Sequence, residues 1–159
     1  RNVIQREITN FKPDGHRLEI ISRDDNSPLI IDDSKATNPD AAVKALYSID
    51  RPIILIAGGQ ERGANFDEFS RAINENVKAL ILLGETRYQL KKEVLKTGFN
   101  NIYTVEDMAE AVTISLKKID KKDCLLLSPG CPSWDMYSSY KKRGKIFKKE
   151  IKLQSDFLD

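Results

Sequence analysis

One stretch decides the fold of this chain: Ile53-Ile54-Leu55-Ile56-Ala57-Gly58-Gly59. Its continuous apolar run predicts a strand that is buried on both faces, as strands of parallel sheets are. The two glycines end the strand, and an amphipathic helix is predicted from Phe66 to about Asn74. An apolar strand that stops at glycine and is followed by a helix is typical of a β-α-β unit.

The same alternation continues along the rest of the chain. Further strands are predicted at Ala79–Leu83, Ile102–Tyr103 and Cys124–Leu127. Helices are predicted from Asp40 to Tyr47, through Tyr88 and Leu95, from Val105 to Ile119, and from about Trp134 to Leu153. This alternation favours right-handed crossovers and a mainly parallel sheet with helices on both faces. The predicted fold class is therefore α/β and Rossmann-like.

The first part of the chain departs from this rhythm. His16–Ser22 and Pro28–Asp32 are predicted strands separated by turn residues, which indicates an N-terminal β-hairpin. Residues 1–14 carry apolar residues at helical spacing and are predicted to lead in from a missing upstream domain. Because the first residue is Arg1, we expect this chain to be a piece of a longer protein, with residues 1–159 forming a single domain.

Composition excludes several function classes. The chain has 40% hydrophobic and 31% charged residues, which is typical of a globular domain. Its 26 Lys and Arg against 24 Asp and Glu give a net charge of +2, too balanced to indicate a nucleic-acid partner. No apolar run is long enough to span a membrane. Cys124 and Cys131 form neither a metal-type pair nor a disulfide framework, which predicts a reducing, cytoplasmic location.

A second stretch, Ile30 to Pro39, carries a dense polar cluster: Asp32-Asp33-Ser34-Lys35-Ala36-Thr37-Asn38. In open α/β sheets, ligands bind beyond the carboxyl ends of the strands. The other strand ends carry Gly58 to Asn65, Gly84 to Arg87, and Ser128 to Asp135, so polar and Gly-rich segments are expected to gather at one edge. This pattern predicts a site for small polar ligands.

Two of these loops have both a structural and a functional interpretation. The segment Gly58–Gly63 is neither a Walker A loop nor a Gly-x-Gly-x-x-Gly loop, and its spacing alone favours a structural turn. Arg62 is either a solvated charge or a guanidinium that binds a carboxylate or phosphate. Ser133 is predicted to cap the last helix, or to bind an anion at the helix start.

Other polar or aromatic residues favour simpler interpretations. Trp134 is predicted to pack in the core, and His16 to be exposed at a strand start. Cys131 lacks a histidine partner, so a thiol nucleophile is not expected. Arg143-Gly144 indicates close packing or a local bend. The last helix is rich in basic residues, which predict a solvated face rather than a nucleic-acid site: Lys141, Lys142, Arg143, Lys145, Lys148, Lys149 and Lys152.

Taken together, the motifs resemble the C-terminal domain of the Mur ligase family, in its D-glutamate-adding members. The segment Asp33–Asn38 is similar to the signature of those members. Supporting motifs follow in the family's order over nearly the whole chain: Gly15-His16-Arg17-Leu18-Glu19, Gly58-Gly59 with Asn65-Phe66, Leu127-Ser128-Pro129 with Ser133-Trp134-Asp135, and Arg143-Gly144.

The resemblance implies an ATP-dependent ligase with three domains. Such an enzyme adds D-glutamate to UDP-N-acetylmuramoyl-L-alanine through an acyl phosphate, in bacterial peptidoglycan synthesis. ATP and Mg2+ would be bound mainly by the central domain, and this chain would close over it. The expected partners are therefore the two substrates, ATP, and the protein's own N-terminal and central domains, and the isolated fragment is expected to be inactive.

The resemblance also implies roles for individual residues. D-glutamate would be bound by Lys35, Thr37, Arg62, Ser133 and Tyr140, and the nucleotide by Arg17 and Asp33. The family usually has lysine where this chain has Arg62. No catalytic residue or metal ligand is expected on this domain. The alternative is a stand-alone domain that binds a nucleotide or amino acid without catalysis.

Overall fold

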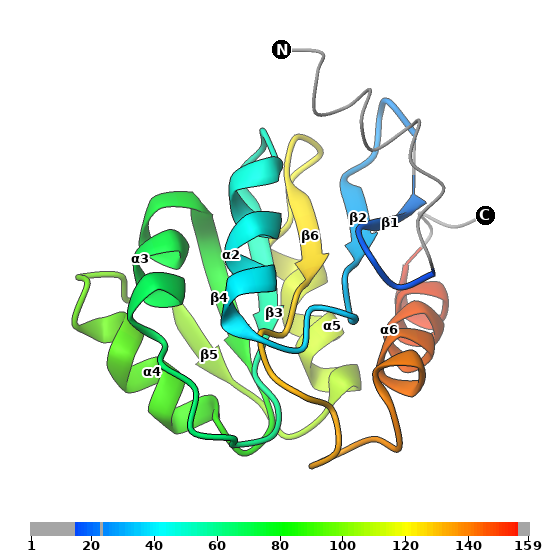
Figure 1. Cartoon of the computed structure of the whole chain (residues 1–159). Coiled ribbons are helices and arrows are strands. Elements are labelled where there is room, and N and C mark those ends of the chain that lie inside the picture. Colours follow the sequence, from blue (N-terminus) through cyan, green and yellow to red (C-terminus); the bar gives the residue numbers. More distant parts are fainter. Residues whose placement is uncertain (1–14, 23, 156–159) are drawn as a thin grey trace.

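One twisted sheet forms the centre of the molecule (Figure 1). The computed structural model describes residues 15–22 and 24–155, and in this part the sheet has the order β1-β2-β6-β3-β4-β5. The strands are β1 (Glu19–Ser22), β2 (Leu29–Asp32), β3 (Ile53–Ala57), β4 (Val77–Leu82), β5 (Ile102–Thr104) and β6 (Cys124–Leu127). The pair β1–β2 is antiparallel and all other neighbours are parallel.

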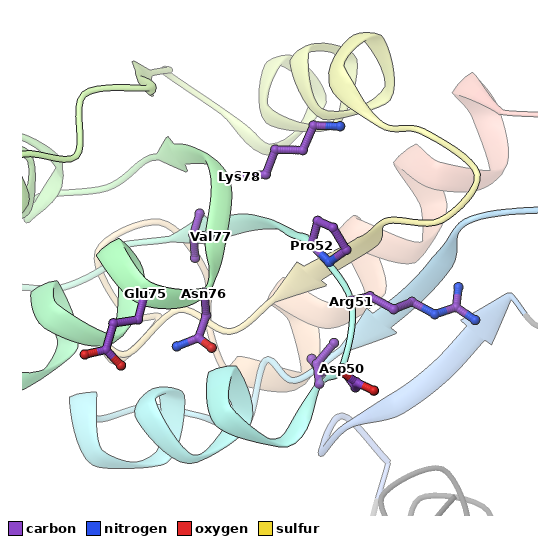
Figure 2. A pocket seen from close by; sticks show the side chains of 8 residues that line it. Asp50, Arg51, Pro52, Glu75, Asn76, Val77 and Lys78 are labelled. Carbon is purple, nitrogen blue, oxygen red and sulfur yellow. The ribbon is translucent and has the colours of Figure 1, made fainter. Parts of the chain in front are cut away.

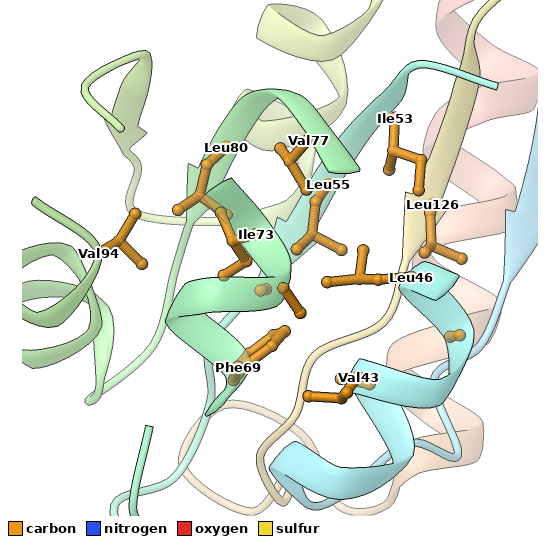
Figure 3. Packing of buried hydrophobic residues seen from close by; sticks show 14 of the residues in the cluster. Val43, Leu46, Ile53, Leu55, Phe69, Ile73, Val77, Leu80, Val94 and Leu126 are labelled. Carbon is orange, nitrogen blue, oxygen red and sulfur yellow. The ribbon is translucent and has the colours of Figure 1, made fainter. Parts of the chain in front are cut away.

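Helices cover both faces of the sheet (Figure 1). They are α2 (Pro39–Ser48), α3 (Asp67–Asn76), α4 (Arg87–Leu95), α5 (Met108–Lys118) and α6 (Tyr140–Gln154). Side chains of α2, α3 and α4 share one apolar cluster with Leu55 of β3 (Figure 3), whereas those of α5 and α6 share another with Ile54 and Ile56. Successive residues of a strand point to opposite faces, so one apolar run serves both clusters.

The predicted α/β, Rossmann-like fold with an N-terminal hairpin is confirmed. The hairpin's first strand begins at Glu19 rather than His16, because His16 and Leu18 have φ angles of 74° and 44°. Such left-handed backbone is incompatible with a strand. The predicted lead-in over residues 1–14 lies outside the described residues. Within them, no helix is both long and apolar enough to cross a membrane.

The predicted start of the last helix near Trp134 is wrong. Helix α6 begins at Tyr140, where the Ser139 side chain accepts a hydrogen bond from the Lys142 N–H at 3.2 Å. Ser133 therefore does not cap this helix. Its carbonyl instead accepts hydrogen bonds from Met136 and Tyr137, which closes a separate turn within the loop.

Candidate functional site

The loops that follow β2, β6 and β3 are joined by backbone hydrogen bonds. The Gly130 N–H donates to the Ala36 carbonyl at 2.9 Å, which joins the loop after β6 to the loop after β2. On the other side, the Gln60 N–H donates to the Pro132 carbonyl at 2.8 Å. The polar segments therefore meet at the carboxyl edge of the sheet, where the parallel strands end. This is the position predicted from the sequence.

The loop after β3 depends on glycine at Gly58. Its φ of 104° is a conformation that L side chains rarely adopt, and a Cβ there would collide with the Leu83 carbonyl oxygen. Only glycine permits this close approach of two loops. The Gly58 N–H donates to the Pro129 carbonyl at 2.9 Å, which fixes the first residue of the loop.

Arg143 of α6 lies beneath the loops and ties two of them together. It is only 2% exposed, and its guanidinium donates to the Ser34 carbonyl at 2.8 Å and the Cys131 carbonyl at 2.9 Å. Burial lowers the pKa of Arg143 to about 10. The prediction of a solvated basic face is therefore wrong for this residue. Close packing at Gly144 is confirmed, since a Cβ there would meet Ser34 Oγ at 2.5 Å.

His16 is also buried, contrary to the prediction of an exposed strand start. Its Nδ1 lies 2.7 Å from Asp32 Oδ2, and Asp32 is fully buried. Glu19 completes a group whose ligand atoms lie close enough for a metal ion. However, the Lys148 ammonium donates to Glu19 Oε2 at 2.6 Å and lies 3.6 Å from Asp32 Oδ2. The group is thus an ion-pair network that joins the hairpin to α6.

Asp33 is held by its neighbours and is only 4% exposed. Burial raises the pKa of Asp33 to about 6, against the opposing effect of hydrogen bonds from the Ser128 hydroxyl (2.7 Å) and the Leu18 N–H (3.1 Å). Each carboxylate oxygen accepts one of these bonds. Because a carboxylate has about four acceptor positions, Asp33 retains the capacity to accept a hydroxyl.

Arg17 and Asp33, the two residues predicted to contact a nucleotide, line the same cleft. The cleft has a volume of about 620 Å³ and lies between the start of the hairpin and α2. This volume is within the usual range for small-ligand sites, roughly 300 to 1,000 Å³. Its other walls come from Leu18, Ala36, Asn38, Asp40, Ala41, Lys44, Ala45 and Ser48.

Three of the residues predicted for D-glutamate lie on the joined loops after β2 and β6. The Lys35 N–H donates to the His16 carbonyl at 3.0 Å, and the Thr37 N–H donates to the Lys35 carbonyl at 2.9 Å. Ser133 is 2% exposed. Tyr140 begins α6, and its ring meets that of His16 edge-on, with centroids 6.2 Å apart.

Arg62, the remaining predicted D-glutamate residue, is exposed and contacts Trp134. The guanidinium carbon lies 5.3 Å from the centroid of the tryptophan ring, and Nε donates to Gln60 Oε1 at 2.9 Å. Trp134 is 63% exposed, so the prediction that it packs in the core is wrong. This pair has no local sequence signal, because the two residues are far apart in the chain and on different loops.

Comparison with known proteins identifies the family. The family described as "Mur ligase, glutamate ligase domain" matches residues 16–131. This chain belongs to the Mur ligase family. It is 47% identical over 149 residues to the UDP-N-acetylmuramoylalanine–D-glutamate ligase of Clostridioides difficile (strain 630), and 42% identical over 150 residues to that of Caldicellulosiruptor saccharolyticus. Each alignment covers 94% of this chain and 33% of the relative, so the chain spans about a third of their length.

Solved structures agree with the fold. A folylpolyglutamate synthase of Mycobacterium tuberculosis complexed with ADP superposes with a TM-score of 0.64 at 13% identity, covering 85% of this chain and 32% of that one. The UDP-N-acetylmuramate-alanine ligase of Thermotoga maritima superposes with a TM-score of 0.58 at 15% identity, covering 88% and 30%. These similarities show that the chain shares its fold with a part of each of these two proteins.

Cys131 lies on the loop after β6, and its thiol is not suited to nucleophilic chemistry. It is 2% exposed, and burial raises the pKa of its thiol to about 11, although the hydrogen-bonding contact with Thr86 opposes this effect. The thiolate is the nucleophilic form of cysteine, so a thiol that stays neutral at physiological pH is unreactive. This agrees with the expectation that Cys131 is no nucleophile.

A second cleft lies at the amino edge of the sheet, where the parallel strands begin (Figure 2). Its volume is about 490 Å³, and it is lined by the residues before β3 and at the start of β4, including Arg51, Pro52 and Lys78. The Lys78 ammonium donates to Asp120 at 2.8 Å and to Asp123 at 2.7 Å. Its charge is therefore already compensated by the protein.

Proposed function

We propose that this chain is the C-terminal domain of a bacterial, cytoplasmic ligase that uses ATP to add D-glutamate to UDP-N-acetylmuramoyl-L-alanine through an acyl phosphate. The observation that carries the proposal is the joining of the Lys35, Ser133 and Arg62 loops beside the Arg17–Asp33 cleft. The names of the similar D-glutamate ligases support this substrate choice.

The proposed D-glutamate site matches the chemistry of a dianionic amino acid. Two carboxylates require two separate sets of donors, and Lys35 and Arg62 lie on different loops of the same edge. Thr37 and Ser133 add hydroxyls, and the backbone at Tyr140 adds to the same set. Each charge-assisted hydrogen bond contributes about 1.5 to 3 kcal/mol. These groups would orient the amine for attack, so this domain contributes positioning and charge stabilisation.

The Arg17–Asp33 cleft is the proposed contact with ATP. Its volume suits a nucleoside, Arg17 provides a cation for phosphate, and Asp33 can accept a ribose hydroxyl. When bound, ATP would supply the phosphoryl group that activates the substrate's carboxylate. The His16–Glu19–Asp32 group does not fit a magnesium site, because the Lys148 ammonium already lies between its carboxylates. We therefore assign Mg2+ to the central domain.

Kinetics of the full-length protein test this proposal. The wild type should form the D-glutamyl amide product, detected by mass spectrometry, with release of ADP. Lys35→Ala should lower kcat/KM for D-glutamate by roughly 10- to 100-fold, the loss of one charged hydrogen bond. Lys92→Ala, an exposed lysine of α4, is the matched control. Unchanged kinetics in Lys35→Ala would refute the site, and absence of the amide product would refute the reaction.

The alternative is a stand-alone binding domain, and one observation favours it: the 620 Å³ cleft is formed by this chain alone. Calorimetry with ATP and with D-glutamate on this chain separates the two. The ligase proposal expects very weak binding, because the opposing domain surface is absent. Micromolar affinity for either ligand would favour the stand-alone domain.

A further inference from the structure

Trp134 is the only tryptophan of the chain, and it lies exposed within the candidate site. Large aromatic side chains usually stabilise a fold by burying their surface. An aromatic ring that is 63% exposed contributes little in this way. Its position on the loop after β6, next to Ser133, indicates a role in the site instead.

The ring of Trp134 is a surface for the Arg62 guanidinium. The guanidinium carbon lies 5.3 Å from the ring centroid, within the roughly 6 Å that defines a cation–π contact. Gln60 Oε1 accepts a hydrogen bond from Arg62 Nε at 2.9 Å. Among the described residues, no other hydrogen bond or ion pair involves this guanidinium. Its two terminal nitrogens therefore remain available for a carboxylate.

The loop that carries Trp134 is hydrogen-bonded to neighbouring loops on both sides of the tryptophan. The Gln60 N–H donates to the Pro132 carbonyl at 2.8 Å, which joins the two loops just before Arg62 and Trp134. On the other side of the tryptophan, Asp135 Oδ2 accepts the Glu85 N–H at 3.0 Å. The ring surface is thus carried by a loop with connections on both sides.

We infer that Trp134 is the positioning residue that orients Arg62 toward a carboxylate of D-glutamate. This inference rests on the proposed function. The guanidinium lies over the indole ring and is held at Nε by Gln60, and these two contacts restrict the orientation of its terminal nitrogens. Arginine suits this arrangement because its fork matches a carboxylate in two parallel hydrogen bonds, which a lysine ammonium cannot do. Orientation before binding reduces the entropy lost when the ligand binds.

Fluorescence of this chain tests the pair without any substrate, since Trp134 is its only tryptophan. Arg62→Ala should uncover one face of the indole and raise the acrylamide quenching constant. Arg87→Ala is the matched control, because Arg87 stacks 4.9 Å from the centroid of another exposed ring, Tyr88. An unchanged quenching constant in Arg62→Ala would show that the pair does not persist in solution and would overturn the inference.

Kinetics of the full-length ligase test the role. Trp134→Leu should raise KM for D-glutamate about two- to fivefold, the value of an exposed cation–π contact, with kcat and KM for ATP unchanged. The KM of Trp134→Phe for D-glutamate should lie between those of the wild type and Trp134→Leu. The KM of Tyr88→Leu should match the wild type. In an Arg62→Ala background, Trp134→Leu should have no further effect.

The outcomes separate this inference from the proposed function. If the wild type adds D-glutamate but KM is unchanged in Trp134→Leu, the inference fails and the ligase proposal stands. The same conclusion follows if Trp134→Leu has its full effect in the absence of Arg62. If the wild type does not use D-glutamate, the proposed function fails and the inference fails with it, whatever the fluorescence shows.

Discussion

The two edges of the sheet both carry a cleft and both carry cations, but the cations differ in their partners. At the amino edge, Lys78 donates to two carboxylates, Asp120 and Asp123, at 2.8 and 2.7 Å. At the carboxyl edge, Arg62 contacts only an aromatic ring and a neutral amide among the described residues. The first arrangement compensates charge within the protein, whereas the second leaves a cation for an anionic ligand.

Backbone hydrogen bonds hold part of the carboxyl edge together. The bonds from Gly130 to Ala36 and from Gln60 to Pro132 join its loops through N–H and carbonyl groups alone. The loops can therefore be held together while some of their side chains face outward. An exposed cation without an acidic partner thus makes the carboxyl edge the stronger candidate site for an anionic ligand.

The largest expected effect tests the Arg143 connection beneath the carboxyl edge. Arg143→Met should lower the free energy of unfolding by roughly 3 to 5 kcal/mol, because two buried carbonyls lose their donors. Chemical unfolding followed by Trp134 fluorescence measures it. Lys142→Met, an exposed neighbour on α6, should change stability by no more than about 0.5 kcal/mol. A loss below about 1 kcal/mol in Arg143→Met would mean that the loops hold together without this side chain.

The next effect depends on pH and concerns Asp33. Its pKa is raised from 3.8 to about 6 in the folded chain, so stability from this group is full below pH 3.8 and is lost as the pH rises through 6. Between about pH 3.8 and pH 6, the free energy of unfolding of the wild type, measured relative to Asp33→Asn, should therefore fall by roughly 3 kcal/mol. Urea unfolding at several pH values measures this difference.

A companion variant checks the cause. The hydrogen bond from Ser128 lowers the pKa of Asp33, so Ser128→Ala should move the loss of stability to higher pH. A pH-independent difference between wild type and Asp33→Asn would contradict the burial of a titrating carboxyl at this edge.

A smaller effect is expected at Gly144. Replacing glycine by alanine in a helix normally stabilises it by about 1 kcal/mol. Here the added Cβ would meet Ser34 Oγ at 2.5 Å and Asp32 Oδ2 at 2.6 Å, so Gly144→Ala should destabilise by about 1 to 3 kcal/mol. Thermal unfolding gives the sign, with Lys145→Ala as the exposed control. A stabilised Gly144→Ala would show that this packing can relax.

The smallest effect is expected at the amino edge. Asp120 is 80% exposed at its side chain, so its pair with Lys78 is screened by water. Asp120→Asn should cost about 0.2 to 1 kcal/mol, and the difference should shrink as salt is added. It should also leave D-glutamate kinetics of the full-length protein unchanged. A change in KM for D-glutamate would break the contrast between the two edges.

The sheet was predictable from sequence because its signals are local. The apolar run Ile53–Ala57 and the residues Cys124–Leu127 form strands with the predicted bounds, since burial on both faces requires continuous apolar residues. The gathering of polar loops at one edge also followed from strand direction. These features depend on neighbouring residues and on the general rules of parallel sheets.

The errors arose where distant residues decide the outcome. Ser133 and Ser139 are both suitable helix caps, and the loop between them contacts the segment after β3 through Trp134 and the segment after β4 through Asp135. His16 is buried because Asp32, sixteen residues later, accepts its hydrogen bond. Trp134 is exposed and contacts Arg62, which lies on another loop. None of these long-range pairings has a local pattern that would reveal it.

The position of β6 has a consequence for how this domain folds. Among the strands of residues 15–22 and 24–155 it is the last in the sequence, yet it lies between β2 and β3 in the sheet. During synthesis, the hairpin and the β3–β5 unit therefore have no strand pairing between them, and each keeps an exposed strand edge, until residues 124–127 have left the ribosome. Unpaired edges promote aggregation. Folding of the nascent domain should thus be late and cooperative, and a chain that stops before β6 should be recognised by chaperones rather than form a stable half-domain.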